Sequence, residues 1–270
     1  MGIETDIAND WHAALAALAW QVDLGVTDLI GESPLDRYDL PEPVKLPDPV
    51  KAPPQPKVNT PRHNPDAPPA PEIGISAAHV AAAGAQSLDD LREALARFEH
   101  CDIKRGARNL VFSDGNPRAP VLILTDAPTV EEDREGRPCT GRAGQMLDRM
   151  FEAIGLARSS DDAAQAVYVV PVMPWRPPNR EPNAQEIAMM RPFIARHIAL
   201  TNPRAVVLMG NSALELGLNQ TGILRHRGAW ATAFDKPALP MAHPSHLLRN
   251  PAAKRDAWAD LLSLKAKLNG

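Results

Sequence analysis

The second half of the chain alternates short apolar runs with longer amphipathic segments. The apolar runs have the length and the β-branched content of strands and lie at 121–126, 167–172, 205–210 and 239–242. Helical spacing of apolar residues marks the segments 142–154, 184–201, about 211–217 and 250–268. Asn183 and Glu186 have the spacing of a capping box at the start of the second helix. This alternation predicts a three-layer α/β/α fold around a mostly parallel, four-stranded sheet, with the nearly all-apolar run 205–210 at its centre.

The first part of the chain has a different pattern. Residues 7–25 place Trp11, Leu15, Leu18 and Val22 at helical spacing, which predicts an amphipathic helix that either packs on the main domain or docks on a protein partner. Residues 41–71 hold 12 of the 28 prolines, and a stretch so poor in apolar residues predicts a disordered linker or a motif for a proline-binding domain. We therefore expect an acidic helical arm (1–40), a linker (41–75) and one globular domain (76–270).

Charge and composition narrow the function classes. Residues 1–40 carry eight acids and one base, whereas residues 76–270 carry 21 acids and 24 bases, so the weakly basic body is compatible with a nucleic-acid partner without requiring one. No apolar run has the length of a membrane span, and the first residues lack the features of a signal peptide, so we expect a cytoplasmic protein with no membrane contact. The two cysteines, Cys101 and Cys139, form neither a disulfide framework nor a C-x-x-C metal motif. Nothing in the sequence indicates a subunit interface, and we expect a monomer.

Polar residues follow the predicted strands. Asp126 ends the first strand, Asn211 follows the third, and His243 and Ser245 follow the fourth. Because ligands of α/β proteins bind beyond the carboxyl ends of parallel strands, the convergence of an acid, an imidazole and a hydroxyl on this edge indicates a site. Each residue also has a simpler interpretation, with Asp126 as a helix cap and His243 as a satisfied strand-end histidine.

Three long blocks favour the functional interpretation. They are TDAPTVEEDREGRPCTGRAGQMLDRM (125–150), WRPPNREPNAQEIAMMRPFIARHIAL (175–200) and AHPSHLLRNPAAKRDAW (242–258). In order and spacing they resemble the family-4 uracil-DNA glycosylases, which carry a Gly-Glu-Ala-Pro-Gly motif after the first strand, a Gly-Arg-Pro-Phe-Val-Gly-Arg-Ala-Gly-Gln loop, an Arg-Pro-Pro-Gly-Asn-Arg stretch and a His-Pro-Ser motif. The resemblance runs from about residue 98 to the carboxyl end. It implies a protein that flips a deaminated base out of DNA and hydrolyses its glycosidic bond.

The resemblance also implies a role for individual residues. His243 would donate a hydrogen bond to the departing base, and Asp126 would hold the attacking water. Ser245 would bind a phosphate, and Leu247 would be the apolar wedge that fills the space left by the flipped base. Further DNA contacts would come from the basic residues Arg142, Arg249, Lys254 and Arg255. The base pocket would be formed by Thr125, Ala127, Pro128, Thr129, Cys139, Pro171 and Asn211.

Several of these positions depart from the family pattern. Thr125 and Thr129 replace the two glycines of the first motif and narrow the pocket, and Asp126 replaces a glutamate one methylene longer. Cys139 replaces the phenylalanine on which uracil stacks, a contact worth about 1–3 kcal/mol per base. Pro171 replaces the asparagine that reads the edge of uracil, and the loss of such a pairing can cost about 10⁴ in discrimination. A glycine is also missing between Pro178 and Asn179.

The family's cofactor forms a separate case. Family-4 enzymes hold an iron-sulfur cluster with four cysteines, and those positions fall on Phe98, Cys101, Trp175 and Met190. One thiolate cannot hold a cluster that needs four ligands. We therefore predict no cluster and no metal, with apolar packing of Phe98, Trp175 and Met190 in its place.

Three functional hypotheses follow. The first is a DNA glycosylase with altered or weakened selectivity for uracil, and the second is a non-catalytic relative that binds DNA or a protein partner through the acidic arm and linker. The third is a hydrolase of small N-glycosides. The intact His-Pro-Ser-x-Leu-Leu-Arg block favours the two DNA-binding hypotheses over the third. The joint loss of the phenylalanine and the asparagine favours the second over the first, whereas the retained acid and His243 favour the first.

Overall fold

The computed structural model describes Leu15 and residues 70–178 and 180–270. The predicted arm (1–40), apart from Leu15, and the predicted linker up to residue 69 lie outside the described residues. The end of that linker was predicted wrongly, because helix α3 (Ala70–Gly84) already begins at Ala70. Proline is compatible with this position, since the first turn of a helix makes no use of the missing N–H of Pro71.

A single sheet forms the centre of the described residues. Its strands are β1 (Asp114–Gly115), β2 (Val121–Thr125), β3 (Val167–Pro171), β4 (Ala205–Met209), β5 (Ala231–Ala233) and β6 (Lys236–Met241), in the order β1-β3-β2-β4-β6-β5. The four predicted strands are confirmed and run parallel, with β2 and β4 in the middle. The predicted number of strands was too low, because β1 and β5 add short antiparallel edges. Strands of two and three residues leave no periodic pattern that a sequence could reveal.

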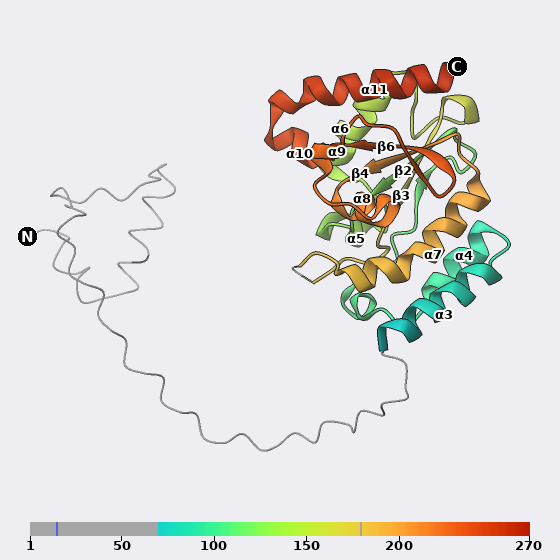
Figure 1. Ribbon diagram of the computed structural model, residues 1–270. Coiled ribbons are helices and arrows are strands. Elements are labelled where there is room, and N and C mark those ends of the chain that lie inside the picture. The colour runs from blue at the N-terminus through green and yellow to red at the C-terminus, as the bar shows by residue number, and fades with distance from the viewer. Residues whose placement is uncertain (1–14, 16–69, 179) are drawn as a thin grey trace, which may run out of the picture. The chain divides into compact units, whose positions relative to one another are not determined.

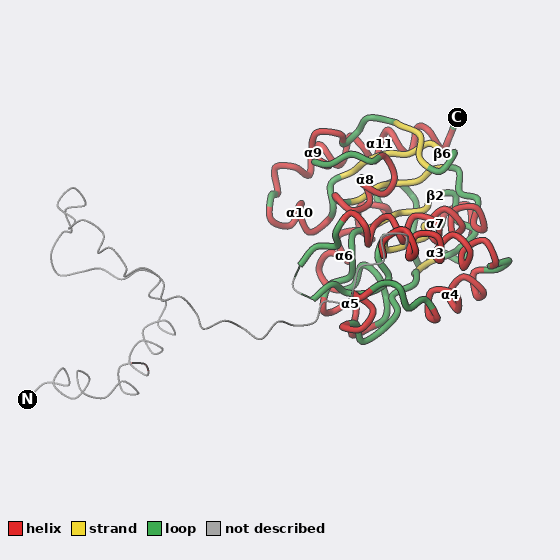
Figure 2. Tube along the Cα trace, turned by 60° about the horizontal axis from the view of Figure 1, so that its bottom comes forward, coloured by secondary structure: helices red, strands yellow, loops and turns green. Residues whose placement is uncertain are grey.

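Helices cover both faces of this sheet (Figure 1). One layer contains α3, α4 (Leu88–Arg97), α7 (Ala184–Thr201) and α8 (Asn211–Leu218), and the other contains α6 (Gly141–Glu152), α10 (Pro244–Arg249) and α11 (Lys254–Asn269). Figure 2 shows α3 and α4 lying along α7, with which both make contacts. The shorter helices are α5 (Val130–Glu135) and α9 (Ile223–His226), with 3-10 turns at Asp102–Gly106, Ala163–Gln165 and Pro251–Ala253. The predicted three-layer α/β/α architecture is confirmed.

The strands pack against both helix layers at once. Leu122 and Leu124 of β2 contact the cluster built on α3, α4 and α7, whereas Val121 and Ile123 contact the cluster built on α6 and α11. Successive side chains of a strand point to opposite faces, and a strand covered on both faces therefore consists of apolar residues throughout. This is why the predicted strands appear in the sequence as continuous apolar runs.

Local sequence patterns predicted the boundaries of one helix correctly and those of another only in part. Helix α7 spans the predicted 184–201, and its capping box is present, because Glu186 N–H donates to Asn183 Oδ1 at 2.9 Å while Asn183 N–H donates to Glu186 Oε2 at 2.8 Å. The predicted helix 250–268 is instead the turn at Pro251–Ala253 followed by α11. No described helix is long and apolar enough to cross a membrane.

The register of the sheet brings the strand ends together. Thr125 pairs with Pro171 of β3 on one side and with Met209 of β4 on the other, and Met209 pairs with Met241 of β6. The residues that follow these strands therefore emerge along one edge. Asp126 and His243 lie at this edge on strands separated only by β4, roughly 10 Å apart by the usual strand spacing.

Candidate functional site

Asp126 is fixed in place by helix α8. Its Oδ1 accepts a hydrogen bond from Ser212 N–H at 2.8 Å, so this carboxylate caps a helix that begins after Gly210 and has no side chain there to cap it. A Cβ at Gly210 would lie 1.9 Å from Asp126 Oδ2, and the φ of this glycine is 109°. Only glycine fits at position 210, and it lets the carboxylate reach the helix.

The same carboxylate is poised to titrate near neutral pH. Burial raises the pKa of Asp126 to about 6, although hydrogen bonds from the backbone amides of Ser212 and Ala213 act in the opposite direction. The group is therefore ionised at pH 7 to 8 and protonated in mild acid. A carboxylate with a pKa in this range suits acid-base chemistry.

Asp126 borders a cavity of about 420 Å³. Four other predicted pocket residues line this cavity as well: Ala127, Pro128, Thr129 and Asn211. Arg176 adds a cation to the wall, where it faces Asp133 Oδ2 at 3.6 Å while its buried Nε has no hydrogen-bond partner among the described residues. His243 does not line this cavity, and it does not line the cavities of about 500 and 440 Å³ that lie elsewhere on the described surface.

The tautomer of His243 follows from its contacts with Ser245. Its Nδ1 accepts a hydrogen bond from Ser245 N–H at 3.2 Å and lies 2.8 Å from Ser245 Oγ. Because a backbone N–H can only donate, Nδ1 carries no proton, and in the neutral ring the proton is on Nε2. Burial lowers the pKa of His243, while nearby Glu132 raises it and Arg249 lowers it. At neutral pH the residue is an uncharged imidazole with an Nε2–H donor.

Sequence comparison identifies the family to which this strand-end site belongs. The chain matches the family model of the uracil DNA glycosylase superfamily over residues 112–262, which include all six strands of the sheet together with Asp126 and His243. The chain belongs to the uracil-DNA glycosylase superfamily.

Individual relatives agree with this assignment. The chain is 29% identical over 190 residues to the type-4 uracil-DNA glycosylase of Sulfurisphaera tokodaii, which covers 66% of this chain and 84% of the relative. It is 31% identical over 169 residues to the type-4 uracil-DNA glycosylase of Thermotoga maritima, covering 60% of this chain and 84% of the relative. A DNA polymerase of Bacillus phage SP01 matches over 157 residues with 27% identity, covering 58% of this chain but only 16% of the polymerase. The similarity to the polymerase is thus confined to one segment of a much longer protein.

Three positions that the superfamily resemblance assigned to the base pocket do not line the cavity. Thr125 and Cys139 are 3% and 1% exposed, and Pro171 is buried next to Thr125 in the sheet. Burial raises the pKa of the Cys139 thiol to about 12, although the nearby Thr125 side chain acts in the opposite direction. These three residues are buried beneath the cavity and do not line it, so their part in a base pocket stays a prediction. A thiol that stays protonated is also no nucleophile.

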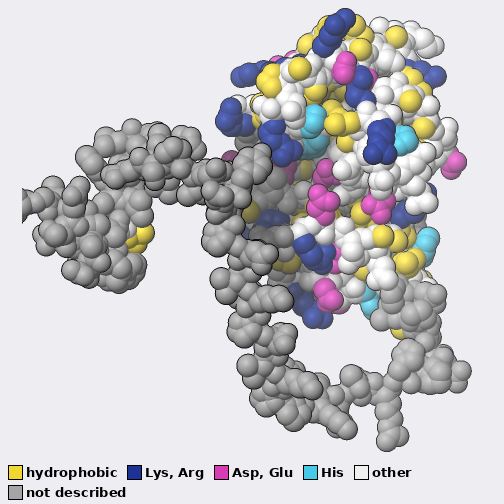
Figure 3. Space-filling model, turned by 60° about the vertical axis from the view of Figure 1, so that its left-hand side comes forward, with side chains coloured by type: hydrophobic (Ala, Val, Ile, Leu, Met, Phe, Trp, Pro, Cys, Tyr) yellow, Lys and Arg dark blue, Asp and Glu magenta, His cyan; other side chains and the backbone are white. Residues whose placement is uncertain are grey.

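The residues predicted to bind DNA lie on the surface with one exception. Arg142, Arg249, Lys254 and Arg255 are exposed and Ser245 is half-buried. Figure 3 shows Lys and Arg side chains on the upper part of the face that carries α9 and α10. Leu247 is the exception, since it is 0% exposed and packs in the core, whereas its neighbour Leu248 is 37% exposed. A wedge must leave the protein surface to enter a duplex, so the assignment of this role to Leu247 is wrong and Leu248 is the leucine available for it.

Two charged residues near the site, Glu132 and Arg158, were not predicted from the sequence. Glu132 accepts hydrogen bonds from the backbone N–H groups of Thr129, at 2.7 Å, and of Cys139, and so it ties together two loops at the strand ends. The capping-box spacing of Thr129 and Glu132 was the available signal. Arg158 contacts the same loop from the other side, and no local motif in the sequence marks it.

The residues present do not fit the iron-sulfur cluster of the family-4 enzymes. Phe98, Cys101, Trp175 and Met190 are all buried in one apolar cluster, and the Phe98 ring meets Phe193 edge-on at 5.2 Å. Burial raises the pKa of the Cys101 thiol to about 11, which disfavours the thiolate that a cluster iron needs. Among the described residues no group of three or more His, Cys, Asp or Glu side chains is arranged to hold a metal. Four thiolates are required and one thiol is present, so the absence of the cluster stays our prediction.

Proposed function

We propose that this protein is a DNA glycosylase of base excision repair that hydrolyses the N-glycosidic bond of a flipped, deaminated base with altered or weakened selectivity for uracil. The observation that carries the proposal is the pair formed by Asp126 and His243 at one edge of the sheet. Asp126 borders the cavity as a carboxylate with a pKa of about 6, and His243 is a neutral imidazole with an Nε2–H donor. The pair matches the two charges that develop when a glycosidic bond breaks.

In the proposed reaction, a water oxygen forms a bond to the sugar C1′ while the bond from C1′ to the base nitrogen breaks. The electron pair of that bond leaves with the base, which becomes an anion. Ionised Asp126 would orient the water and accept its proton, and His243 Nε2–H would donate a hydrogen bond to the departing base. Neither residue needs to change its protonation state beforehand at pH 7 to 8.

We infer the change in selectivity from position 171, which lies in the core beneath the cavity. Pro171 offers neither a side-chain donor nor a backbone N–H, so the amide that reads uracil in the family has no counterpart here. Arg176 supplies a guanidinium to the same cavity, and its buried Nε lies 3.6 Å from Asp133 Oδ2. A guanidinium donates to carbonyl oxygens, which uracil, hypoxanthine and xanthine all present, so all three deaminated bases are candidate substrates.

A direct assay tests this function. The purified full-length protein is incubated with single- and double-stranded oligonucleotides that carry uracil, hypoxanthine, xanthine or a mismatch, and abasic sites are measured by alkaline cleavage. Product from at least one substrate is expected, and it should be abolished by Asp126→Asn. The exposed carboxylate Glu152 provides the matched control, since Glu152→Gln should leave excision unchanged.

A non-catalytic, DNA-binding relative is the second candidate. The observation that favours it is that Asp126 and His243 each accept a hydrogen bond from the first turn of a helix, which gives both residues a structural role. The absence of abasic sites with every substrate, alongside DNA binding that weakens as salt is added, would support this candidate and exclude the first. Under either candidate, the arm (1–40) stays a proposed contact for a protein partner.

A further inference from the structure

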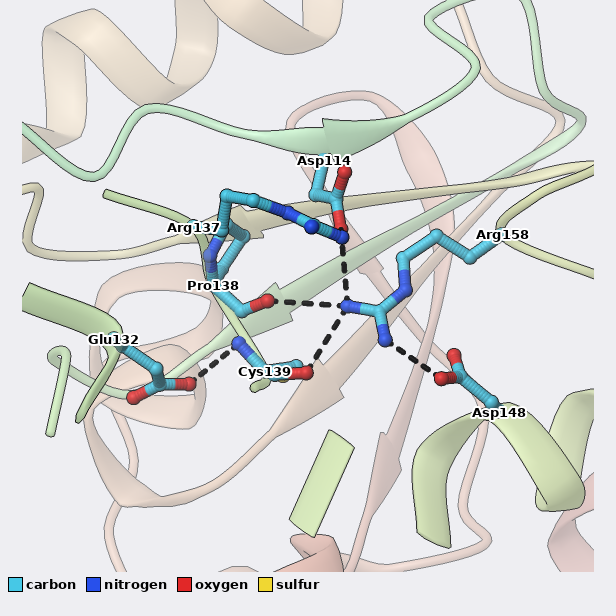
Figure 4. Close-up of polar contacts among 7 residues, drawn as sticks. All are labelled: Asp114, Glu132, Arg137, Pro138, Cys139, Asp148 and Arg158. Atoms are coloured by element: carbon cyan, nitrogen blue, oxygen red, sulfur yellow. Dashed lines mark hydrogen bonds and ion pairs between the residues drawn. The ribbon is translucent and has the colours of Figure 1, made fainter. Parts of the chain in front are cut away.

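The backbone of Cys139 is held from both sides by charged side chains (Figure 4). Its N–H donates to Glu132 Oε1, and its carbonyl accepts from Arg158 Nη1 at 3.1 Å. The carbonyl of the preceding Pro138 accepts from the same nitrogen at 3.1 Å. The 137–140 loop is therefore bound to Glu132 of α5 on one side. On the other side it is bound to Arg158, which lies 19 positions after Cys139 in the chain.

Arg158 is itself held rigidly. Its Nη2 donates to Asp148 Oδ2 at 2.7 Å, its Nη1 lies 3.2 Å from Asp114 Oδ2, and its side chain is 13% exposed. The two carboxylates come from β1 and α6, so the guanidinium joins an edge strand, a helix and the loop. Only a planar fork with several donors can serve two carbonyls and two carboxylates at once, and a lysine in this position could not.

The loop needs this support because its conformation is unfavourable. Cys139 has a φ of 51°, a left-handed conformation that is unfavourable for a residue with a Cβ. The first turn of α6 lies against this backbone and needs a glycine there, because a Cβ at Gly144 would lie 1.8 Å from the Cys139 carbonyl oxygen. A strained backbone persists only where surrounding contacts fix it, and these contacts converge on Cys139.

The strained conformation has a consequence for the candidate site. It turns the Cys139 side chain inward, where the thiol is 1% exposed and lies near Thr125 at the end of β2. Thr125 directly precedes Asp126 in the chain. The position of the 137–140 loop therefore affects the position of Thr125, and through Thr125 the strand end that carries the candidate water-binding carboxylate of Asp126.

We propose that Arg158 is a positioning residue for the candidate site, which fixes the 137–140 loop so that Cys139 stays packed against Thr125 beneath Asp126. The relevance of this loop to catalysis rests on the proposed function, whereas the positioning itself does not. Arg158 lines a separate cavity of about 500 Å³, which Asp126 does not line, and it would act through Cys139 rather than on the substrate.

The two native cysteines provide a test that needs no enzymatic activity. Each is buried, Cys139 at 1% and Cys101 at 1% exposed, but they lie in different clusters on opposite faces of the sheet. In the full-length protein, the rate of iodoacetamide modification is measured for each thiol by peptide mass spectrometry. Arg158→Met should accelerate modification of Cys139 by roughly tenfold or more, since exposure returns a buried thiol toward its ordinary reactivity, while Cys101 stays protected.

Matched variants separate positioning from general stability. Arg149→Met, which removes an exposed arginine from the last turn of α6, should leave both thiols protected. Arg158→Lys keeps a positive charge for Asp114 and Asp148 but cannot serve both carbonyls, so it should still accelerate Cys139 selectively, to a smaller extent. Equal acceleration of both thiols would overturn the proposal, because it would mean that Arg158 stabilises the whole domain. A folded Arg158→Met protein with wild-type protection of Cys139 would overturn it as well.

A second measurement links the loop to the site. If excision is found, Arg158→Met should lower kcat on the excised base while Arg149→Met leaves kcat unchanged. If no base is excised, the proposed function fails while the thiol result still stands. The two failures are therefore distinguishable.

Discussion

The carboxylate of Asp126 accepts the N–H of Ser212 at 2.8 Å, so the residue that ends strand β2 caps helix α8 across the sheet edge. This contact means that Asp126 serves the fold as well as the cavity. Replacement by asparagine keeps an acceptor at this position, and replacement by alanine removes it. Asp126→Asn should therefore be more stable than Asp126→Ala by about 1 kcal/mol, the usual value of a capping hydrogen bond. Urea denaturation of both variants at pH 8 measures the difference, and equal stability would show that the cap contributes nothing.

The raised pKa of Asp126 predicts a pH dependence of any excision activity. The carboxylate must be ionised to orient water, and its pKa is about 6. Single-turnover excision should therefore rise with pH and reach half its maximum near pH 6. A rate that is already maximal at pH 5 would exclude ionised Asp126 from the reaction.

The raised pKa of Asp126 also makes the stability of the fold depend on pH, and stability should fall where activity rises. Because the folded protein binds the Asp126 proton more tightly than the unfolded chain does, this group stabilises the fold below the unfolded pKa near 4 and loses that contribution as pH rises to about 6. The stability of the wild type relative to Asp126→Asn should therefore fall between these pH values and stay level above them. Thermal denaturation of the pair from pH 4 to 8 measures it. A constant difference over this range would contradict the raised pKa.

The ionisation of His243 should respond to its neighbours. Arg249 lowers the pKa of this imidazole through its positive charge, so Arg249→Gln should raise the pKa. Arg255→Gln, which removes another exposed arginine nearby in the sequence, provides the control. Histidine titration by NMR reports the pKa directly, and the Nε2–H tautomer should be visible in the nitrogen shifts at pH 8. A pKa equal in the wild type and Arg249→Gln would remove Arg249 from the electrostatics of the site.

Two adjacent leucines of α10 should behave in opposite ways. Leu247 is fully buried, so Leu247→Ala should cost about 2–5 kcal/mol of unfolding free energy. Leu248 is exposed, so Leu248→Ala should change stability by less than about 0.5 kcal/mol. If Leu248 enters DNA, its truncation should weaken binding to a duplex with an abasic site while binding to undamaged DNA is unchanged. Equal affinities of the wild type and Leu248→Ala for both duplexes would exclude the wedge.

Restoring the uracil pocket should require three substitutions rather than two. Pro171→Asn supplies the missing amide and Cys139→Phe the missing ring, but the ring has no room beside Thr125, and overpacking of this kind costs about 1–3 kcal/mol. The double variant should therefore melt at a lower temperature and release no uracil. Addition of Thr125→Gly should relieve the overlap and give measurable uracil excision. Excision by the double variant alone would show that Thr125 does not block the pocket.

The sheet was predictable because its central strands are buried on both faces. Burial on both sides leaves continuous apolar runs, and β2, β3 and β4 each consist of five buried residues. Helix α7 was predictable from its capping box. Helix α4 carries a similar signal at Ser87 and Asp90, which the sequence interpretation did not use. The Ala-rich helix α3 shows no clear apolar face, so no periodic pattern distinguished it from the proline-rich segment before it.

The site was predictable at the level of the sheet edge but not of individual side chains. Asp126 and His243 lie where parallel strands end, and strand order alone places them there. The inward turn of Cys139 depends on a positive φ in a residue other than glycine, and this conformation is imposed by contacts with Glu132 and Arg158 that are distant in sequence. The choice between Leu247 and Leu248 depends on the rotation of a short helix, where neighbours point about 100° apart.

Asp126 and His243 each have a structural role besides their candidate catalytic role, and this bears on how the superfamily evolves. Asp126 caps α8 and His243 caps α10, so a lineage that ceased to cut DNA would still be selected to keep both side chains for the sake of a folded domain. An acid and a histidine at these positions in other genomes are therefore weak markers of activity. The residues released from selection first would be those that only read the base, and position 171 is where an inactive descendant should diverge earliest.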